Sequence, residues 1–121
     1  MHVMKSTNIA VVESYLDGLN TKDLSRVSFA PDVTFEGPLS AKIIGPAAVR
    51  EFLTGLFPAI RGIRVKRHIA EGEFVATEFD FDTTFGVIPV FDCFRVTGGL
   101  LAQIRPYYDP RPITNPKPDI K

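Results

Sequence analysis

The chain of 121 residues is 45% hydrophobic and 23% charged, which is typical of one soluble globular domain. Its 14 Lys and Arg residues balance 14 Asp and Glu residues, and this argues against nucleic acid as a partner, because phosphate binding requires a clustered basic surface. The single cysteine, Cys93, excludes an intrachain disulfide and a cysteine zinc site. Without an apolar run of membrane-spanning length or a signal-peptide pattern, we expect no membrane contact and a cytoplasmic location.

The first third of the chain predicts two helices and one short strand. Residues 7–19 carry apolar side chains at helical spacing and predict an amphipathic helix. A second short helix is expected to follow, with Thr21 or Asp23 as its cap and a break at Pro31. Residues 33–36 then alternate between apolar and polar side chains, which predicts a short strand.

A loop and a third helix are predicted in the middle of the chain. Residues 39–45 are expected to form a loop that touches the mouth of a pocket. Pro46 suits the first position of a helix, and Pro58 limits that helix at its other end. The apolar residues between the two prolines have the spacing of one helical stripe.

Four long strands joined by tight turns are predicted for the second half. They cover residues 63–69, 74–82, 87–96 and 100–108, and glycines stand at the turns between them. Three helices followed by such hairpins predict an α+β fold, in which a curved antiparallel sheet packs on the helices. Helices cannot lie flush along a strongly curved sheet, so we expect a cavity between the two layers.

The domain is expected to comprise residues 1–109. Residues 110–121 contain four prolines and predict a Pro-rich C-terminal tail, extended as a strap or disordered.

The strand at residues 74–82 has two different faces, and the sequence leaves their directions open. Glu78, Asp80 and Asp82 alternate with Phe79 and Phe81, so the acids share one side and the aromatic rings the other. Either the acids face water, paired across the sheet to basic residues, or they line the cavity while the rings meet another surface. The first alternative is the simpler one for any single acid on a strand.

Several local sequences resemble the nuclear transport factor 2-like superfamily, in its branch of ketosteroid isomerases and SnoaL-type polyketide cyclases. They are YLDGLN at 15–20, FAPDVTFE at 29–36, GPAAVREF at 45–52, DCFRV at 92–96 and RPYYD at 105–109. The resemblance covers nearly all of the chain to residue 109. It implies a cone-shaped domain with an internal pocket, in a superfamily that hosts many different chemistries.

The resemblance to ketosteroid isomerases assigns two hydrogen-bond donors. Tyr15 matches the tyrosine of the first helix, and Asp92 matches the protonated aspartate of a late strand, which together form the oxyanion hole. The general base of these enzymes stands directly before a proline, where this chain has Gly37 before Pro38. The usual proton shuttle is therefore expected to be broken.

A second relative implied by the resemblance is limonene epoxide hydrolase, which activates water with an Asp-Arg-Asp arrangement. Here Glu78 stands in place of the arginine, Asp80 matches one aspartate, and Pro106 replaces the other. This match favours acids that face the cavity, and it leaves Phe79 and Phe81 outside. An outward apolar row predicts a homodimer through the sheet.

The site residues expected on these grounds fall into two groups. The catalytic candidates are Tyr15, Asp92 and Asp80. The substrate-binding candidates are Glu78, Phe35, Gly37 and Tyr108. The ligand expected is a small apolar molecule, steroid-like or polyketide-like, and no cofactor or metal is expected. Two functions stay open: a cofactor-independent isomerase, cyclase or hydrolase, and a non-catalytic ligand-binding or assembly domain.

Overall fold

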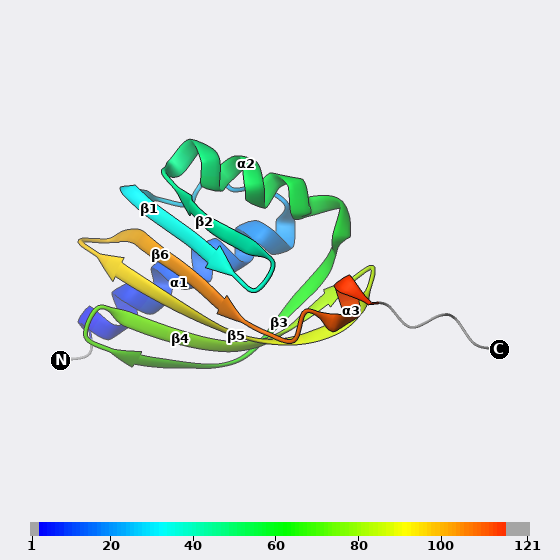
Figure 1. Ribbon diagram of the computed structural model, residues 1–121. Helices are drawn as coiled ribbons and strands as arrows, with labels where there is room; N and C mark the ends of the chain where they lie inside the picture. Colours follow the sequence, from blue (N-terminus) through cyan, green and yellow to red (C-terminus); the bar gives the residue numbers. More distant parts are fainter. Residues whose placement is uncertain (1–2, 116–121) are drawn as a thin grey trace.

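Six strands form one curved sheet, and helices cover one of its faces (Figure 1). The computed structural model describes residues 3–115. The elements in chain order are α1 (Val3–Thr21), β1 (Phe29–Gly37), β2 (Ser40–Ile44), α2 (Pro46–Leu56), a 3-10 turn η1 (Phe57–Ala59), β3 (Ile60–Glu71), β4 (Phe74–Thr83), β5 (Gly86–Thr97), β6 (Leu100–Tyr107) and α3 (Arg111–Thr114).

The strand order is β2-β1-β6-β5-β4-β3. Neighbouring strands are antiparallel except β1 and β6, which run parallel. The long hairpins of β3 to β6 form the main sheet, and α1 crosses it, whereas α2 lies over β1 and β2 (Figure 1). The predicted α+β fold, a curved sheet packed on helices, is confirmed.

The short helix predicted before Pro31 is absent, because the segment between α1 and β1 makes turns instead. Leu24 and Val27 are buried in the core, but their carbonyl oxygens accept hydrogen bonds from the Arg50 guanidinium, each at 2.9 Å. These bonds from α2 satisfy the carbonyl groups that a helix would have paired internally. The apolar spacing of the segment therefore reflects burial without a helix.

The loop predicted at residues 39–45 contains β2. This strand pairs antiparallel with β1, with Phe35 opposite Ile43. Most of its residues are exposed or half-buried, so no alternation of apolar and polar side chains marks it in the sequence. Leu39 and Ser40 nevertheless line the cavity, as expected for this segment.

The core lies between the sheet and the two long helices. Its fully enclosed side chains come from α1, α2 and the strands, and include Val12, Leu16, Val49, Leu53, Val75, Phe94, Leu101 and Ile104. Each such side chain contributes about 1.5–3 kcal/mol when it leaves water. No helix within residues 3–115 has both the length and the apolar character needed to cross a membrane.

The start of the predicted tail is ordered. Arg111–Thr114 forms one helical turn, α3, against the end of β6, so residues 110–115 are neither an extended strap nor disordered. The rest of the predicted tail, residues 116–121, lies outside the described residues.

Candidate functional site

The strand β4 places its aromatic rings under the helices and its acids on the outer face. Phe79 is 4% exposed, and both Phe79 and Phe81 line the cavity. Glu78 and Asp80 point to the opposite side, because side chains alternate along a strand. The expectation that Glu78 and Asp80 enter the cavity is therefore wrong, and so is the outward position of the two rings.

Basic side chains of β3 hold these acids on the outer face. Arg67 Nε lies 2.9 Å from Glu78 Oε1, and Lys66 Nζ lies 3.6 Å from Asp80 Oδ1. Such half-exposed pairs contribute about 0–1 kcal/mol each. Both side chains stay in contact with water here. Neither Glu78 nor Asp80 lines the cavity.

A cavity of about 260 Å³ lies between the helices and the inner face of the sheet. Phe35, Gly37 and Tyr108, predicted as substrate-binding residues, all line it. Its remaining wall is almost wholly apolar and includes Leu19, Phe52, Leu53, Leu56, Ala59, Phe79, Phe81, Ile88, Val90, Pro106 and Ile113. Among residues 3–115, Asp92 is the only carboxyl group that lines it, and no imidazole does.

Tyr15 and Asp92, predicted as oxyanion donors, lie together in the buried wall of this cavity. They are 1% and 3% exposed. Helix α1 supplies Tyr15, whose ring packs edge-on against Phe94 of β5 at 5.4 Å between centroids. Burial raises the pKa of the Tyr15 hydroxyl well above its usual range.

The buried position of Asp92 favours its neutral form. Burial raises the pKa of its carboxyl well above its usual range, and the hydrogen bond from the Arg105 backbone N–H lowers it by less. Its Oδ1 atom has no hydrogen-bond partner within the described residues. A neutral carboxyl group next to a tyrosine hydroxyl offers two O–H donors to a ligand oxygen. A buried oxygen without a partner carries an energetic penalty, which a ligand can relieve.

Gly37, where related isomerases carry their base, lines the cavity at the end of β1. A Cβ atom at this position would lie 3.2 Å from Pro106 Cγ and 3.6 Å from Phe35 Cε1. A side chain there would therefore enter the cavity and require a shift of a few tenths of an ångström. The natural chain leaves this position without any functional group.

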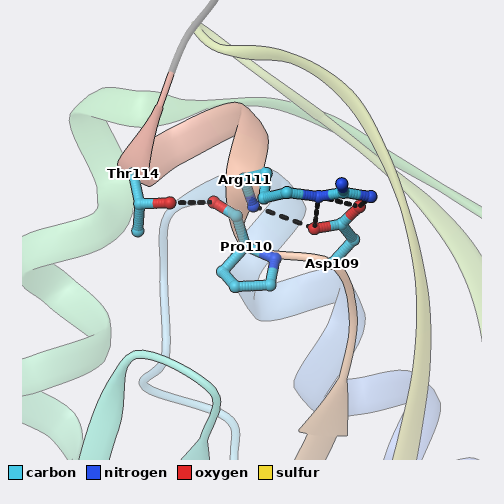
Figure 2. A network of polar contacts seen from close by, with 4 residues as sticks. All are labelled: Asp109, Pro110, Arg111 and Thr114. Carbon is cyan, nitrogen blue, oxygen red and sulfur yellow. Dashed lines mark hydrogen bonds and ion pairs between the residues drawn. The ribbon is translucent and has the colours of Figure 1, made fainter.

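The short helix α3 contributes Ile113 to the lining of the cavity. Figure 2 shows how Asp109 anchors this turn: its carboxylate accepts hydrogen bonds from the backbone N–H of Arg111 at 3.0 Å and from the guanidinium at 2.7 Å. These bonds lower the pKa of Asp109 to about 2. Thr114 Oγ1 donates to the Pro110 carbonyl oxygen at 3.3 Å.

The cavity residues that sequence reasoning missed include the inward rings of β4, the ring of Phe52 and Ile113. One sequence signal indicates that the rings of β4 face inward. Basic residues on β3 stand opposite the acids of β4 and can pair with them on the outer face. Within residues 3–115 no group of three His, Cys, Asp or Glu side chains is placed to hold a metal ion.

The model of the SnoaL-like domain family matches residues 12–104. A search of the curated proteins finds no match. Among solved structures, an NTF2-like protein of unknown function from Cytophaga hutchinsonii is 19% identical, with a TM-score of 0.75 and coverage of 88% of this chain and 93% of that one. A candidate ketosteroid isomerase from Kribbella flavida is 21% identical, with a TM-score of 0.74 and coverage of 96% and 84%. An LEH-like epoxide hydrolase from M. tuberculosis is 25% identical, with a TM-score of 0.68 and coverage of 86% and 84%.

Proposed function

Because the chain belongs to the SnoaL-like domain family, we propose that its cavity binds a small apolar molecule that carries one hydrogen-bond-accepting oxygen. Tyr15 and Asp92 donate to that oxygen, and the aromatic wall holds the rest of the molecule. The solved structures with the same fold include a candidate ketosteroid isomerase, and the matching family is SnoaL-like, so a rigid carbonyl compound of steroid or polyketide type fits the proposal.

One observation carries this proposal: Asp92 is a buried carboxyl group in an otherwise apolar wall, where burial raises its pKa, and its Oδ1 lacks a partner within the described residues. A buried polar group without a partner costs about 1–3 kcal/mol. A ligand oxygen that accepts from Asp92 recovers this energy. A purely apolar ligand would not, so the oxygen is the part of the ligand that the site selects.

A matched pair of probes tests this selection. The ketone 2-acetylnaphthalene and its carbon analogue 2-isopropenylnaphthalene have the same shape, but only the ketone accepts hydrogen bonds. One hydrogen bond contributes about 0.5–1.5 kcal/mol net, so the ketone should bind roughly two- to tenfold more tightly per bond. Isothermal titration calorimetry or ligand-observed NMR measures both affinities.

Variants show which groups are responsible. Tyr15→Phe and Asp92→Leu each remove one donor and should lower the ketone preference toward one, whereas Tyr108→Phe removes a hydroxyl elsewhere in the wall and should leave it unchanged. Equal binding of ketone and alkene to the natural protein would contradict the proposed role of both donors, provided that both probes bind.

The second candidate function is catalysis without a cofactor, as an isomerase, cyclase or hydrolase. The observation that favours it is the pairing of two neutral donors in one dry wall, since such donors stabilise a developing oxyanion by about 3 kcal/mol each. The absence of any other carboxyl or imidazole in the described lining favours binding instead. Proton transfer requires a base within hydrogen-bond reach of the substrate.

Restoring a base separates the two functions. We expect slow or absent isomerisation of a 5-ene-3-ketosteroid by the natural protein and a faster reaction by Gly37→Asp, with Gly37→Asn as a control of the same shape. The steady-state rate decides. Fast isomerisation by the natural protein would mean that the site holds a base that this structure does not reveal. If the Gly37→Asp variant folds and binds the steroid but reacts no faster than the natural protein, ligand binding is the better supported function.

A further inference from the structure

A row of polar side chains crosses the sheet beneath α1. The register places His68 of β3 opposite Thr77 of β4, and Thr77 opposite Asp92 of β5. Thr77 is 0% exposed and Asp92 is 3% exposed, in a core whose buried side chains are mostly apolar. The row begins at Glu13 of α1, whose side chain is 59% exposed, and ends at the wall of the ligand cavity.

A β-bulge turns His68 toward this row. Simple alternation along β3 places it on the same side as Arg64 and Lys66, which predicts an exposed histidine. The pairing with β4 shifts by one residue between Val65 and Arg67, and an extra residue reverses the direction of all later side chains. His68 therefore faces α1, and its side chain is only 13% exposed.

The hydrogen bonds of His68 define the direction of the row. Its Nε2 lies 3.1 Å from Glu13 Oε2, and its Nδ1 lies 2.8 Å from Thr77 Oγ1. A carboxylate only accepts, so the neutral ring carries its proton on Nε2 and accepts at Nδ1 from the Thr77 hydroxyl. The Thr77 oxygen keeps a free lone pair, and the residue opposite it on the next strand is the neutral Asp92.

Thr77 and Asp92 lie directly opposite each other on neighbouring strands. Residues directly opposite in an antiparallel pair have β-carbons about 4.5–5.5 Å apart. The Oδ1 atom of Asp92 has no partner within the described residues, so an O–H on that atom is free to donate to the Thr77 oxygen without the loss of another bond.

We propose that Thr77, His68 and Glu13 form a proton relay that connects Asp92 with solvent beside Glu13 of α1. Asp92 gives its proton to Thr77 Oγ1, Thr77 gives its own proton to His68 Nδ1, and His68 releases the Nε2 proton to Glu13. One proton has moved, Asp92 is a carboxylate, and His68 is the other neutral tautomer. The same steps in reverse return a proton from water.

Such a relay deepens the proposed function, because it serves the donor on which that function rests. A ligand that fills the cavity separates Asp92 from water at the mouth. The relay lets Asp92 exchange its proton while the ligand is bound. Thr77 and His68 are positioning residues in this scheme, since neither touches the ligand.

Few other titratable groups face the two ends of the row. Glu13 of α1 is the charged group that contacts His68, and Tyr15 of α1 lies close enough to Asp92 for an ionised Asp92 to raise the pKa of Tyr15. Cys93 and Arg105, which neighbour Asp92 on β5 and β6, occupy the outward-facing positions opposite each other. A change in His68 can therefore be followed at Asp92 with little interference.

The test uses the protein without ligand, so its failure and the failure of the proposed function are distinguishable. Protonated His68 donates from both nitrogens, and the Thr77 hydroxyl then turns to donate to Asp92, which favours the carboxylate. We expect the ¹³C signal of the Asp92 carboxyl to show a step at the pH at which the His68 ring titrates. The step should vanish in Thr77→Val and return in Thr77→Ser.

Glu13→Gln provides a second measurement on an exposed residue that should not disturb folding. It removes the negative partner of His68, so both the ring titration and the Asp92 step should move together to lower pH. If the ¹³C signal of Asp92 in the natural protein shows no step at the pH at which His68 titrates, the relay is overturned. So does a full-sized step in Thr77→Val, because the coupling would then act through space. If Thr77→Val does not fold, the relay is overturned by a Glu13→Gln protein in which the two transitions fail to move together.

Discussion

Replacement of Asp92 by asparagine should make the protein relatively more stable as pH rises. In the unfolded chain this aspartate ionises above about pH 3.9, whereas in the folded chain burial raises its pKa well above that value. Between the two pKa values the folded state therefore holds one proton more than the unfolded state. Stability then falls as pH rises, by about 1.4 kcal/mol per pH unit for one proton.

Asparagine cannot ionise, so this contribution to the slope is removed. Any hydrogen bond that its buried amide fails to make costs the same at every pH. Urea denaturation at pH 5, 6, 7 and 8 should therefore show a stability difference between Asp92→Asn and the natural protein that grows in favour of the variant by up to about 1.4 kcal/mol per pH unit. Asp80→Asn, on the outer face, serves as the control and should show no such trend.

A constant difference between Asp92→Asn and the natural protein over this range would refute the reasoning. It would mean that the folded protein binds no extra proton at Asp92. The carboxyl would then be ionised, and it could accept hydrogen bonds from a ligand but could not donate to one.

Three further predictions concern the rim and the outer face. Asp109→Ala should release α3 and raise the dissociation rate of 2-acetylnaphthalene several-fold, as measured by NMR line shapes; an unchanged rate would mean that α3 does not restrict the mouth. Asp80→Asn should leave the affinity for this ketone unchanged, and a large loss would return Asp80 to the site. The homodimer stays a prediction, although Phe79 and Phe81, from which it was inferred, face the cavity. Phe91 and Tyr107 are 40% and 56% exposed on the outer face and lie opposite each other. Sedimentation should show a dimer that Phe91→Glu dissociates, and a natural monomer at micromolar concentration would contradict it.

The sequence predicted the long hairpins because period-two alternation and glycine turns depend only on local geometry. It could not predict β2, whose mostly exposed residues carry no alternation. It also could not predict that Leu24 and Val27 are buried without a helix, because the Arg50 guanidinium that binds their carbonyl groups comes from a later element.

Within the candidate site, Tyr15, Asp92 and Gly37 were placed at the cavity by resemblance, and the structure finds them in its wall. Their position follows from the fold that the family shares. The direction of β4 was predicted wrongly, because alternation shows that the acids and the rings face opposite ways but not which side is inside. A one-residue change of register would turn the acids inward and the rings outward.

Charge on the neighbouring strand decides that question. Glu78 and Asp80 stand opposite a strand that carries Arg64, Lys66 and Arg67, and ion pairs between neighbouring strands are most favourable when both partners remain in water. Acids drawn to those bases cannot also enter an apolar cavity without losing both water and partner. The same bases lie on both sides of a bulge, which is why His68 turns inward where alternation predicts it outward. Basic residues at a spacing that breaks the period of two thus indicate both that the acids of β4 face outward and that His68 faces inward.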